Sequence, residues 1–294
     1  MLESGLTVAC AGAGLLGGAI MQRLVESGVR LHVWNRTVER LTPVLDKGAT
    51  LAETPADLAR ASDIVLTCVT GERAVEEIVF GPDGVASTGS ADKVLLDMST
   101  SDPEATKDMA ARLREACDMG WVDAPISGGA PAALKGAMTV MAGAEEADFA
   151  RVQPVMRHLA GRCTRMGPVG AGQATKMINQ TLVACTVAVL AEATALAQRA
   201  GVDALQIPAA LAGGRADSRL LQEFMPKMAT PDFTPEGSNK NMVKDLEMIH
   251  ALAAATGTVM PVTALVGELY RQLVLRGRAE DCISTFVTLY QDSA

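Results

Sequence analysis

The stretch Gly172–Ala200, GQATKMINQTLVACTVAVLAEATALAQRA, decides how this chain is organised. No proline interrupts the sequence between Pro168 and Pro208, and Gly201 lies where the C-terminal cap of a helix is expected. Because Ala, Leu, Val and Thr predominate, the stretch predicts one helix, roughly 40 Å long at about 1.5 Å per residue. Such a helix is longer than usual in globular proteins, so we expect it to run through or between domains.

A membrane span is the alternative interpretation of this stretch. Its apolar run is interrupted by four polar side chains, at Lys176, Asn179, Gln180 and Glu192. We expect these interruptions to leave the run too short to cross a bilayer, which requires about 20 apolar residues. The sequence therefore favours a helix of a protein core.

The composition of the 294-residue chain is that of a globular protein of one or two domains, with 49% hydrophobic and 20% charged residues. The formal net charge of −8 argues against general nucleic-acid binding, because no excess of cations is present to replace phosphate counterions. A small anionic substrate is compatible with this charge, since a local site can be cationic in an acidic protein.

The six cysteines are scattered, without a C-x-x-C pair or a neighbouring histidine cluster. This pattern predicts buried thiols rather than disulfides or metal ligands, and we expect no metal site. No basic region precedes the first apolar segment, so we expect that segment to be a strand rather than a signal peptide. A cytoplasmic location follows as the default, with no membrane partner.

A glycine-rich turn follows the first apolar run, Leu6–Ala11. The run is typical of a buried parallel strand, and Ala19–Val25 after the turn is typical of a helix. A G-x-G-x-x-G motif in this setting indicates a dinucleotide site, because its glycines permit a tight turn, approach of the pyrophosphate and close helix packing. A plain strand–turn–helix is the alternative. We expect the cofactor phosphates to lie on Gly12, Ala13, Gly14, Leu15, Leu16 and Gly17.

The second apolar strand, Leu31–Trp34, ends in Asn35, Arg36 and Thr37. About twenty residues beyond the glycines, an acidic side chain would hold the ribose 2′-hydroxyl of NAD. Here Arg36 can instead pair with a 2′-phosphate in a bidentate manner, and Thr37 can add a hydrogen bond. The sequence therefore predicts NADP(H) in preference to NAD(H); the alternative is a surface arginine at a strand end.

Strands and helices continue to alternate after this point. Buried strands are expected at 63–69 and 93–98, and helices at 72–80 and 103–117. This alternation predicts a parallel, doubly wound α/β sheet of the Rossmann type.

Ligands in such sheets lie beyond the carboxyl ends of the strands. We therefore expect Val69, Thr70 and Thr100 to line the dinucleotide site together with the glycine turn. Ser99 and Thr100 can equally form the N-cap of the helix that begins near Pro103, and the two roles are compatible.

The segment Trp121–Pro131 contains a serine followed by two glycines, Ser127, Gly128 and Gly129. Such a composition is often only a turn. Two glycines after a serine also expose consecutive backbone N–H groups beside a hydroxyl, which suits an anion such as a carboxylate. Both interpretations stay open from the residues alone.

The first domain is expected to end with strands at 137–142 and 163–166 and a helix at 145–159. The rest of the chain has apolar residues at helical spacing, which predicts an all-α domain. Its helices are expected at 202–212, 218–228, 242–255, 262–276 and 280–290. We therefore expect a Rossmann-like domain at 1–166 and an all-α domain at 167–294, joined through the long helix.

Two lysines in the C-terminal half, Lys176 and Lys244, are candidates for function. Lys176 lies at the start of the long helix, where the positive end of the helix dipole disfavours a cation, so its presence requires another reason. Asn179 follows three residues later and therefore shares its helix face. A solvated surface position is the alternative for either lysine.

Four separated blocks resemble the β-hydroxyacid dehydrogenases, the group of 3-hydroxyisobutyrate dehydrogenase, tartronate semialdehyde reductase and the glyoxylate/succinic semialdehyde reductases. The blocks are GAGLLG at Gly12–Gly17, DAPISGG at Asp123–Gly129, GAGQATKMINQ at Gly170–Gln180 and MVKDL at Met242–Leu246. Their order and spacing match from end to end, so the resemblance covers the whole chain. The second and third blocks together make it specific.

The resemblance implies roles for particular residues. Lys176 would be the catalytic residue, and Lys244 would reach the cofactor from the second domain. The substrate would be held by Ser127, Gly128, Gly129 and Asn179. Departures from the family pattern, which bear on the substrate rather than on the general activity, occur at Thr70, Ala132 and Gln180.

We therefore expect an NADP(H)-dependent oxidoreductase that interconverts a small semialdehyde or keto acid and its hydroxy acid, with Lys176 as proton donor and acceptor. The alternative is a non-catalytic NADPH-binding or oligomeric interaction protein on the same fold. The expected partner is a small carboxylate-bearing aldehyde or hydroxy acid, and the resemblance implies a homodimer or homotetramer.

Overall fold

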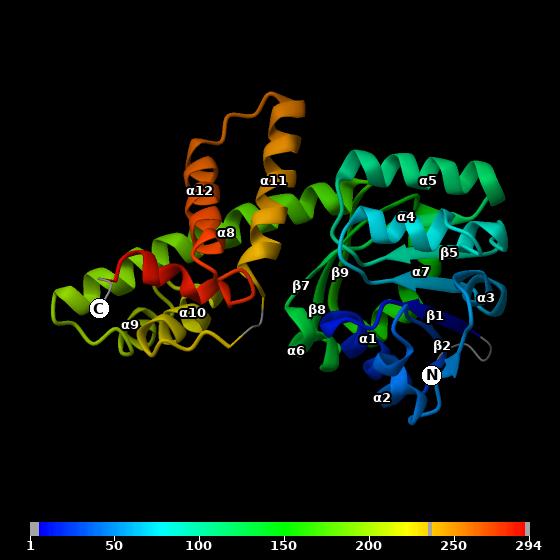
Figure 1. Ribbon diagram of the computed structural model, residues 1–294, viewed down its shortest axis with the longest axis horizontal. Coiled ribbons are helices and arrows are strands. Elements are labelled where there is room, and N and C mark those ends of the chain that lie inside the picture. Colours follow the sequence, from blue (N-terminus) through cyan, green and yellow to red (C-terminus); the bar gives the residue numbers. More distant parts are fainter. Residues whose placement is uncertain (1–5, 235–236, 292–294) are drawn as a thin grey trace. The chain divides into compact units, whose positions relative to one another are not determined.

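The computed structural model describes residues 6–234 and 237–291. The chain divides into two compact units, one ending at Lys176 and the other beginning at Met177. The boundary falls inside the long helix α8 (Ala171–Arg199), so α8 contributes to both units. The first unit is a sheet with helices on both faces, and the second consists of helices (Figure 1). A Rossmann-like domain followed by an all-α domain is the architecture that the sequence predicts.

The described part of the first unit holds one nine-stranded sheet. Its strands follow the order β3-β2-β1-β4-β5-β6-β8-β7, and β9 also pairs with β8. The first six strands run parallel to their neighbours, and the order reverses between β1 and β4, where such sheets bind ligands. The strands are β1 (Thr7–Ala11), β2 (Arg30–Trp34), β3 (Thr50–Leu51), β4 (Ile64–Thr67), β5 (Val94–Asp97), β6 (Gly120–Asp123), β7 (Ile126–Ser127), β8 (Met138–Ala144) and β9 (Ala160–Gly167).

The last part of the sheet departs from the parallel arrangement that the sequence predicts. Strand β8 pairs antiparallel with β6 and β7, and parallel with β9. A parallel return requires a crossover of about a dozen residues or more. Only Ala124 and Pro125 separate β6 from β7, and a six-residue helix, α6 (Gly129–Leu134), lies between β7 and β8. The chain therefore turns back along the sheet instead of crossing over it.

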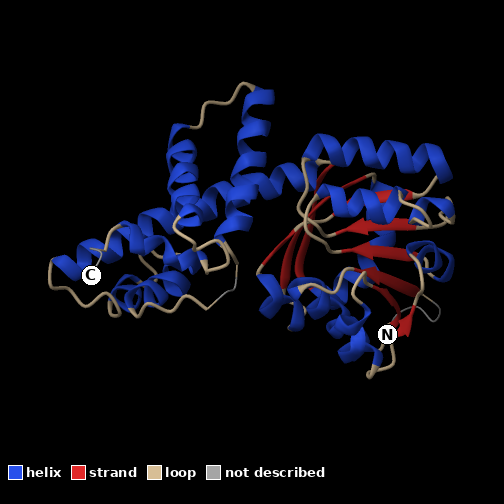
Figure 2. Cartoon of the chain, viewed as in Figure 1, coloured by secondary structure: helices blue, strands red, loops and turns tan. Residues whose placement is uncertain are grey.

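Helices cover both faces of the sheet, and each face has its own hydrophobic core (Figure 2). Ile20 and Val155 from two helices lie in one core, and Leu58, Val79 and Leu113 from three others lie in the second. The helices are α1 (Leu15–Glu26), α2 (Thr42–Leu45), α3 (Pro55–Ala61), α4 (Glu72–Phe80), α5 (Pro103–Cys117) and α7 (Glu146–Leu159). The sequence prediction omits α3, although Thr54 and Asp57 form a capping box at its start.

Strand β1 shows why the sequence of this sheet is so apolar. Val8 and Cys10 lie in one core, whereas Ala9 and Ala11 lie in the other. Successive side chains of a strand point to opposite faces, so a strand covered on both faces buries every side chain. All five residues of β1 are buried accordingly.

The second unit is built on the remainder of α8. Leu190 of α8 packs in one core with Met225, Ile249 and Leu273 from three other helices. The other elements are α9 (Ile207–Leu211), α10 (Arg219–Ala229), α11 (Asn239–Thr256), α12 (Pro261–Leu275) and the 3₁₀ segment Ile283–Leu289.

Two of the predicted helices of this unit differ in the structure. The helix expected at 202–212 is reduced to α9, because Pro208 is tolerated only in the first turn of a helix. The segment expected to be a helix at 280–290 forms a 3₁₀ segment instead.

Helix α8 is long and apolar enough to cross a membrane, with a mean hydropathy of 1.6 over an 18-residue window. The prediction that its polar residues leave the run too short is therefore wrong. The core helix of a globular protein passes the same test, and 44% of this window is buried inside the structure. Ala184, Val187 and Ala191 are fully buried in the core of the second unit. Their burial, rather than the composition of α8, favours a core helix.

Candidate functional site

The turn between β1 and α1 has a shape that two of its glycines make possible. Gly12 has a φ of 104°, and a Cβ there would overlap the carbonyl oxygen of Cys68. A Cβ on Gly17 would overlap the carbonyl oxygen of Gly12. The first glycine therefore makes the tight turn, and the third allows α1 to approach β1 closely.

Gly14, the middle glycine, leaves open space beside the backbone. A Cβ at this position would meet no atom within 4 Å. Gly14 is also the N-cap residue of α1, where no side chain accepts a backbone hydrogen bond and no acidic residue lies in the first turn. An anion suits such a helix N-terminus, because backbone N–H groups and the positive end of the dipole point towards it. The turn therefore fits the pyrophosphate of a dinucleotide.

Asn35 connects this turn to the end of β2. Its Oδ1 accepts a hydrogen bond from the Ala13 N–H at 2.9 Å, and its Nδ2 donates one to the Thr37 carbonyl at 2.7 Å. Both polar atoms of the Asn35 amide thus form hydrogen bonds with the protein's own backbone. Arg36 and Thr37, which follow it, are exposed at the carboxyl end of β2. Of the three predicted residues, Arg36 and Thr37 are the ones with accessible side chains.

Ser99 joins the ends of β4 and β5. Its Oγ accepts from the Val69 N–H at 3.0 Å, and its own N–H donates to Asp97 Oδ1 at 3.0 Å. Thr70 is exposed and Thr100 is half-buried beside these bonds. The predicted cofactor residues after β4 and β5 therefore lie at neighbouring strand ends.

The N-cap of α5, which was the second open interpretation for Ser99 and Thr100, is made by another residue. Asp102 caps α5, and its Oδ1 accepts from the Glu104 and Ala105 N–H groups at 2.9 and 3.0 Å. Since α5 begins at Pro103, only Asp102 directly precedes it.

The Ser127–Gly129 segment forms the turn from β7 into α6. Gly128 and Gly129 have φ values of 113° and 61°, which L side chains rarely adopt. A Cβ on Gly128 would lie 2.6 Å from the Cβ of Ala132. The turn interpretation is therefore correct, and binding of a carboxylate by this turn stays a prediction that is compatible with it.

Lys176 lies beside this turn, although 50 residues separate it from Ile126. Its Nζ donates a hydrogen bond to the Ile126 carbonyl at 2.9 Å, and the residue is only 8% exposed. Ile126 directly precedes Ser127, so the structure brings the predicted proton donor to the predicted carboxylate-binding turn. The alternative of a solvated surface lysine is wrong for Lys176.

Two buried residues outside the predicted site hold the start of α8. Asp123, the last residue of β6, accepts from the Gly170 N–H through Oδ1 and from the Gln173 N–H through Oδ2, both at 2.8 Å. The Gln173 side chain bonds to the backbone of Ser99 and Ser101. Both residues belong to the two blocks that carry the resemblance, which is the signal that could have identified them.

Asp123 lies in register with Asp97 on the neighbouring strand β5, and both are fully buried. Burial raises the pKa of Asp123 to about 7; its two backbone hydrogen bonds oppose this shift, and the nearby Asp97 adds to it. Burial also raises the pKa of Asp97, whose Oδ2 has no hydrogen-bond partner in the described part of the chain.

Asn179 and Lys244 belong to the second unit, where a polar network joins α8 to α11. Asn179 Nδ2 donates to Gln180 Oε1 at 2.9 Å, and Gln180 Nε2 donates to Asp245 Oδ2 at 2.6 Å. Lys244 Nζ lies 3.4 Å from Asp245 Oδ1. The roles expected of Asn179 and Lys244 towards substrate and cofactor stay predictions.

The cysteines and acidic residues form no evident metal centre. Within residues 6–234 and 237–291, no three His, Cys, Asp or Glu side chains are grouped so that they could hold a metal ion. All six cysteines are free thiols, and three of them are buried.

Known protein families match both halves of the chain. Residues 7–167 match the NAD-binding domain of 6-phosphogluconate dehydrogenase, and residues 170–290 match the NAD-binding domain of NADP-dependent 3-hydroxyisobutyrate dehydrogenase. The chain is 33% identical to the 2-hydroxy-3-oxopropionate reductase of Escherichia coli (strain K12) over 273 residues, which cover 92% of this chain and 91% of that protein.

Solved structures resemble the chain over nearly its whole length. The 3-hydroxyisobutyrate dehydrogenase from Salmonella typhimurium matches with a TM-score of 0.86 and 26% identity, covering 97% of this chain and 99% of that one. Psf3 in complex with NADP⁺ and 2-OPP matches with a TM-score of 0.89 and 21% identity, covering 97% of this chain and 100% of that one. At that identity the second likeness shows the fold alone.

Proposed function

Because this chain belongs to the family of NAD(P)-dependent 3-hydroxyacid dehydrogenases, oxidoreductases that act on CH–OH groups, we propose that it interconverts a small semialdehyde or keto acid and the corresponding hydroxy acid. The E. coli relative is named for 2-hydroxy-3-oxopropionate, a small carboxylate that carries an aldehyde. A substrate of this class needs a site for its carboxylate and a proton donor near its carbonyl oxygen.

The observation that carries the proposal is the hydrogen bond between Lys176 Nζ and the Ile126 carbonyl, 2.9 Å long. It holds an ammonium group beside the Ser127–Gly129 turn. In the proposed site the backbone N–H groups of this turn bind the substrate carboxylate, together with the Ser127 hydroxyl. Asn179 orients the substrate from the next turn of α8. The substrate is thereby fixed with its carbonyl oxygen near Lys176.

Lys176 moves the proton in this proposal. In reduction its ammonium group gives a proton to the carbonyl oxygen, and in oxidation its neutral amine takes the proton of the hydroxyl group. The nicotinamide, when bound, supplies or accepts the hydride. Proton transfer by a positioned side chain contributes about 10²–10⁴-fold in rate.

The proposed cofactor is NADP(H) rather than NAD(H). The open space at Gly14 and the uncapped N-terminus of α1 support a dinucleotide at the glycine turn. Exposed Arg36 supports the preference, because a guanidinium at this strand end can pair with the 2′-phosphate.

Replacement of Lys176 by methionine tests the function. Lys176→Met removes the proton donor and keeps an unbranched side chain, so we expect turnover to fall by about 10²–10⁴-fold while NADPH binding is retained. Turnover is measured by NADPH oxidation with glyoxylate, succinic semialdehyde, tartronate semialdehyde and methylmalonate semialdehyde, and NADPH binding by fluorescence titration. Lys47→Met, at an exposed lysine paired with Glu26, is the matched control.

Two results would contradict the proposal. Near-normal turnover in Lys176→Met would remove Lys176 from the mechanism. Silence of the unmodified protein across the whole substrate panel, with NADPH still bound, would favour a non-catalytic NADPH-binding protein on the same fold.

A further inference from the structure

We propose that Asp123 and Gln173 are positioning residues that hold the first turns of α8, and Lys176 with them, against the carboxyl ends of β5 and β6. The inference rests on the proposed function of Lys176, because the position of these turns affects turnover only if this lysine takes part in it. All residues involved belong to the first unit, which ends at Lys176.

Asp123 caps α8 from a different element. Helix caps are usually side chains of the residue before the helix, but this position is occupied by Gly170, which has none. The carboxylate of Asp123 accepts the N–H groups of Gly170 and Gln173 instead, both at 2.8 Å. Its negative charge lies at the positive end of the helix dipole, where it is favourable.

The contacts around this cap are tight. A Cβ on Gly172 would lie 2.5 Å from the Met141 carbonyl oxygen and 2.6 Å from the Asp123 carbonyl oxygen. A Cβ on Gly143 would lie 2.5 Å from Asp123 Oδ1. Two glycines, one on α8 and one on β8, are therefore needed for this approach. The start of α8 is placed by direct contact with the backbone of β6 and β8.

Gln173 extends the anchor to the loop after β5. Its Oε1 accepts from the Ser101 N–H at 3.1 Å, and its Nε2 donates to the Ser99 carbonyl at 2.9 Å. The residue is fully buried, so neither bond competes with solvent. The two bonds bracket Thr100, which is a predicted cofactor residue. The helix that carries Lys176 is thereby tied to the loop that is expected to contact the cofactor.

Lys176 follows Gln173 by three residues and lies on the same side of α8. Its side chain is fixed at Nζ by the Ile126 carbonyl and at Cα by the anchored backbone of the helix. Without the Asp123 carboxylate, two N–H groups lose their acceptor and the first turn loosens. A misplacement of about 1 Å in a reacting group can cost about 10²-fold in rate.

The test compares Asp123→Ala, Asp123→Asn and Gln173→Met with the unmodified protein at pH 8, above the raised pKa of Asp123. Hydrogen exchange of the amides at 170–176 reports the anchoring of α8 without reference to activity. We expect Asp123→Ala to accelerate this exchange and to lower kcat by about 10–100-fold, with the Kd for NADPH changed less than about threefold. Asp123→Asn keeps one acceptor oxygen and should restore part of the kcat. Gln173→Met keeps the length of the side chain but removes both hydrogen bonds, and should lower kcat in the same way.

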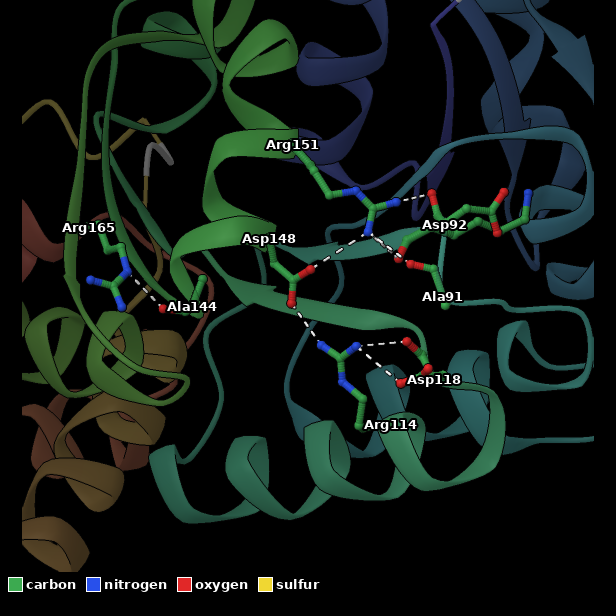
Figure 3. Close-up of polar contacts among 9 residues, drawn as sticks. Ala91, Asp92, Arg114, Asp118, Ala144, Asp148, Arg151 and Arg165 are labelled. Atoms are coloured by element: carbon green, nitrogen blue, oxygen red, sulfur yellow. Dashed lines mark hydrogen bonds and ion pairs between the residues drawn. The ribbon is translucent and has the colours of Figure 1, made fainter.

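Asp148 provides the matched control (Figure 3). Its side chain is 8% exposed, with Oδ2 at 2.9 Å from Arg114 and Oδ1 at 3.7 Å from Arg151. It packs against Gly120, the first residue of β6, whereas Asp123 is the last residue of that strand. Asp148→Asn therefore removes a buried carboxylate at the opposite end of β6 from Asp123, and should lower stability while leaving kcat and exchange at 170–176 unchanged.

The inference is overturned if folded Asp123→Ala and Gln173→Met keep kcat within about threefold of Asp148→Asn, or if exchange at 170–176 does not change. If Asp123→Ala fails to fold, Asp123→Asn and Gln173→Met decide by the same criteria. Lys176→Met separates this inference from the proposed function. Near-normal turnover in Lys176→Met refutes the proposed role of Lys176. Loss of turnover in Lys176→Met without loss in the Asp123 and Gln173 variants refutes the positioning role alone.

Discussion

Replacement of Asp123 by asparagine should change how the stability of the first unit depends on pH. Burial raises the pKa of the Asp123 carboxyl from 3.8 to about 7 in the folded protein. The folded protein therefore holds a proton between about pH 4 and pH 7 that the unfolded chain has released. It follows that the free energy of unfolding decreases as the pH rises through this window, and that asparagine, which does not titrate, abolishes this contribution.

The size of the effect follows from the pKa shift. A shift of roughly three pKa units, at about 1.4 kcal/mol per unit, corresponds to about 4 kcal/mol. Asparagine leaves one backbone N–H at the start of α8 without an acceptor, which costs about 1–3 kcal/mol at every pH. The diagnostic quantity is therefore the change with pH in the stability difference between Asp123→Asn and the unmodified protein. We expect this difference to move in favour of asparagine by about 4 kcal/mol between pH 4 and pH 8.

Urea unfolding followed by tryptophan fluorescence measures this difference. The chain has two tryptophans, Trp34 and Trp121, and both lie in the first unit, so the signal reports that unit. Trp121 lies on β6 itself, two residues before Asp123. Unfolding curves between pH 4 and pH 8 give the free energy of unfolding of each variant by linear extrapolation.

Parallel pH profiles for the two proteins would refute this reasoning, because they would mean that Asp123 does not take up a proton in the folded state. Asp97→Asn is the companion variant. Since Asp97 raises the pKa of Asp123, its replacement should lower that pKa and move the window to lower pH.

Two further predictions concern the cofactor site. Gly17→Ala should destabilise the first unit by about 1–3 kcal/mol or more, because its Cβ would overlap the Gly12 carbonyl oxygen. Gly14→Ala should leave the melting temperature unchanged and weaken NADPH binding at least tenfold, because its Cβ fills the space proposed for the pyrophosphate. Thermal melts and NADPH titrations of both variants check this, and an unchanged NADPH affinity in Gly14→Ala would speak against a pyrophosphate at this position. Arg36→Asp should raise the KM for NADPH by about 10²-fold and alter the KM for NADH little, because a carboxylate repels the 2′-phosphate. An equal rise in the KM for both cofactors would show that Arg36 does not contact this phosphate.

Much of the fold could be predicted because its signals are local. The apolar run of β1, the glycine motif and the helix after it follow one another within twenty residues, and each has a specific steric reason. The prediction is wrong at two places, although the physical reason at each is local. The antiparallel course of β8 depends on the short connections around Ser127, and α9 is short because Pro208 is tolerated only in the first turn of a helix.

The sequence predicts the functional residues of the candidate site better than it predicts the residues that hold them in place. Lys176 and the Ser127–Gly129 turn are predictable because the blocks that contain them resemble those of a known family. Asp123 and Gln173 belong to the same blocks, but a carboxylate at a strand end and a glutamine on a helix have no functional signature of their own in sequence. Their hydrogen bonds to Gly170, Ser99 and Ser101 exist only in the folded chain.

The sequence by itself determined the two-part architecture, the dinucleotide turn and the family, because strand and helix periodicity, glycine sterics and motif spacing act over short stretches of chain. Only the tertiary structure decided that Lys176 is buried against the Ile126 carbonyl and that an acid of β6 caps the helix that carries it. The long helix illustrates the difference: its composition alone is compatible with a membrane span, and the burial of its side chains favours a core helix. Burial and hydrogen-bond partners depend on residues that lie far apart in sequence, and these are the quantities that fix charge, position and pKa at the site.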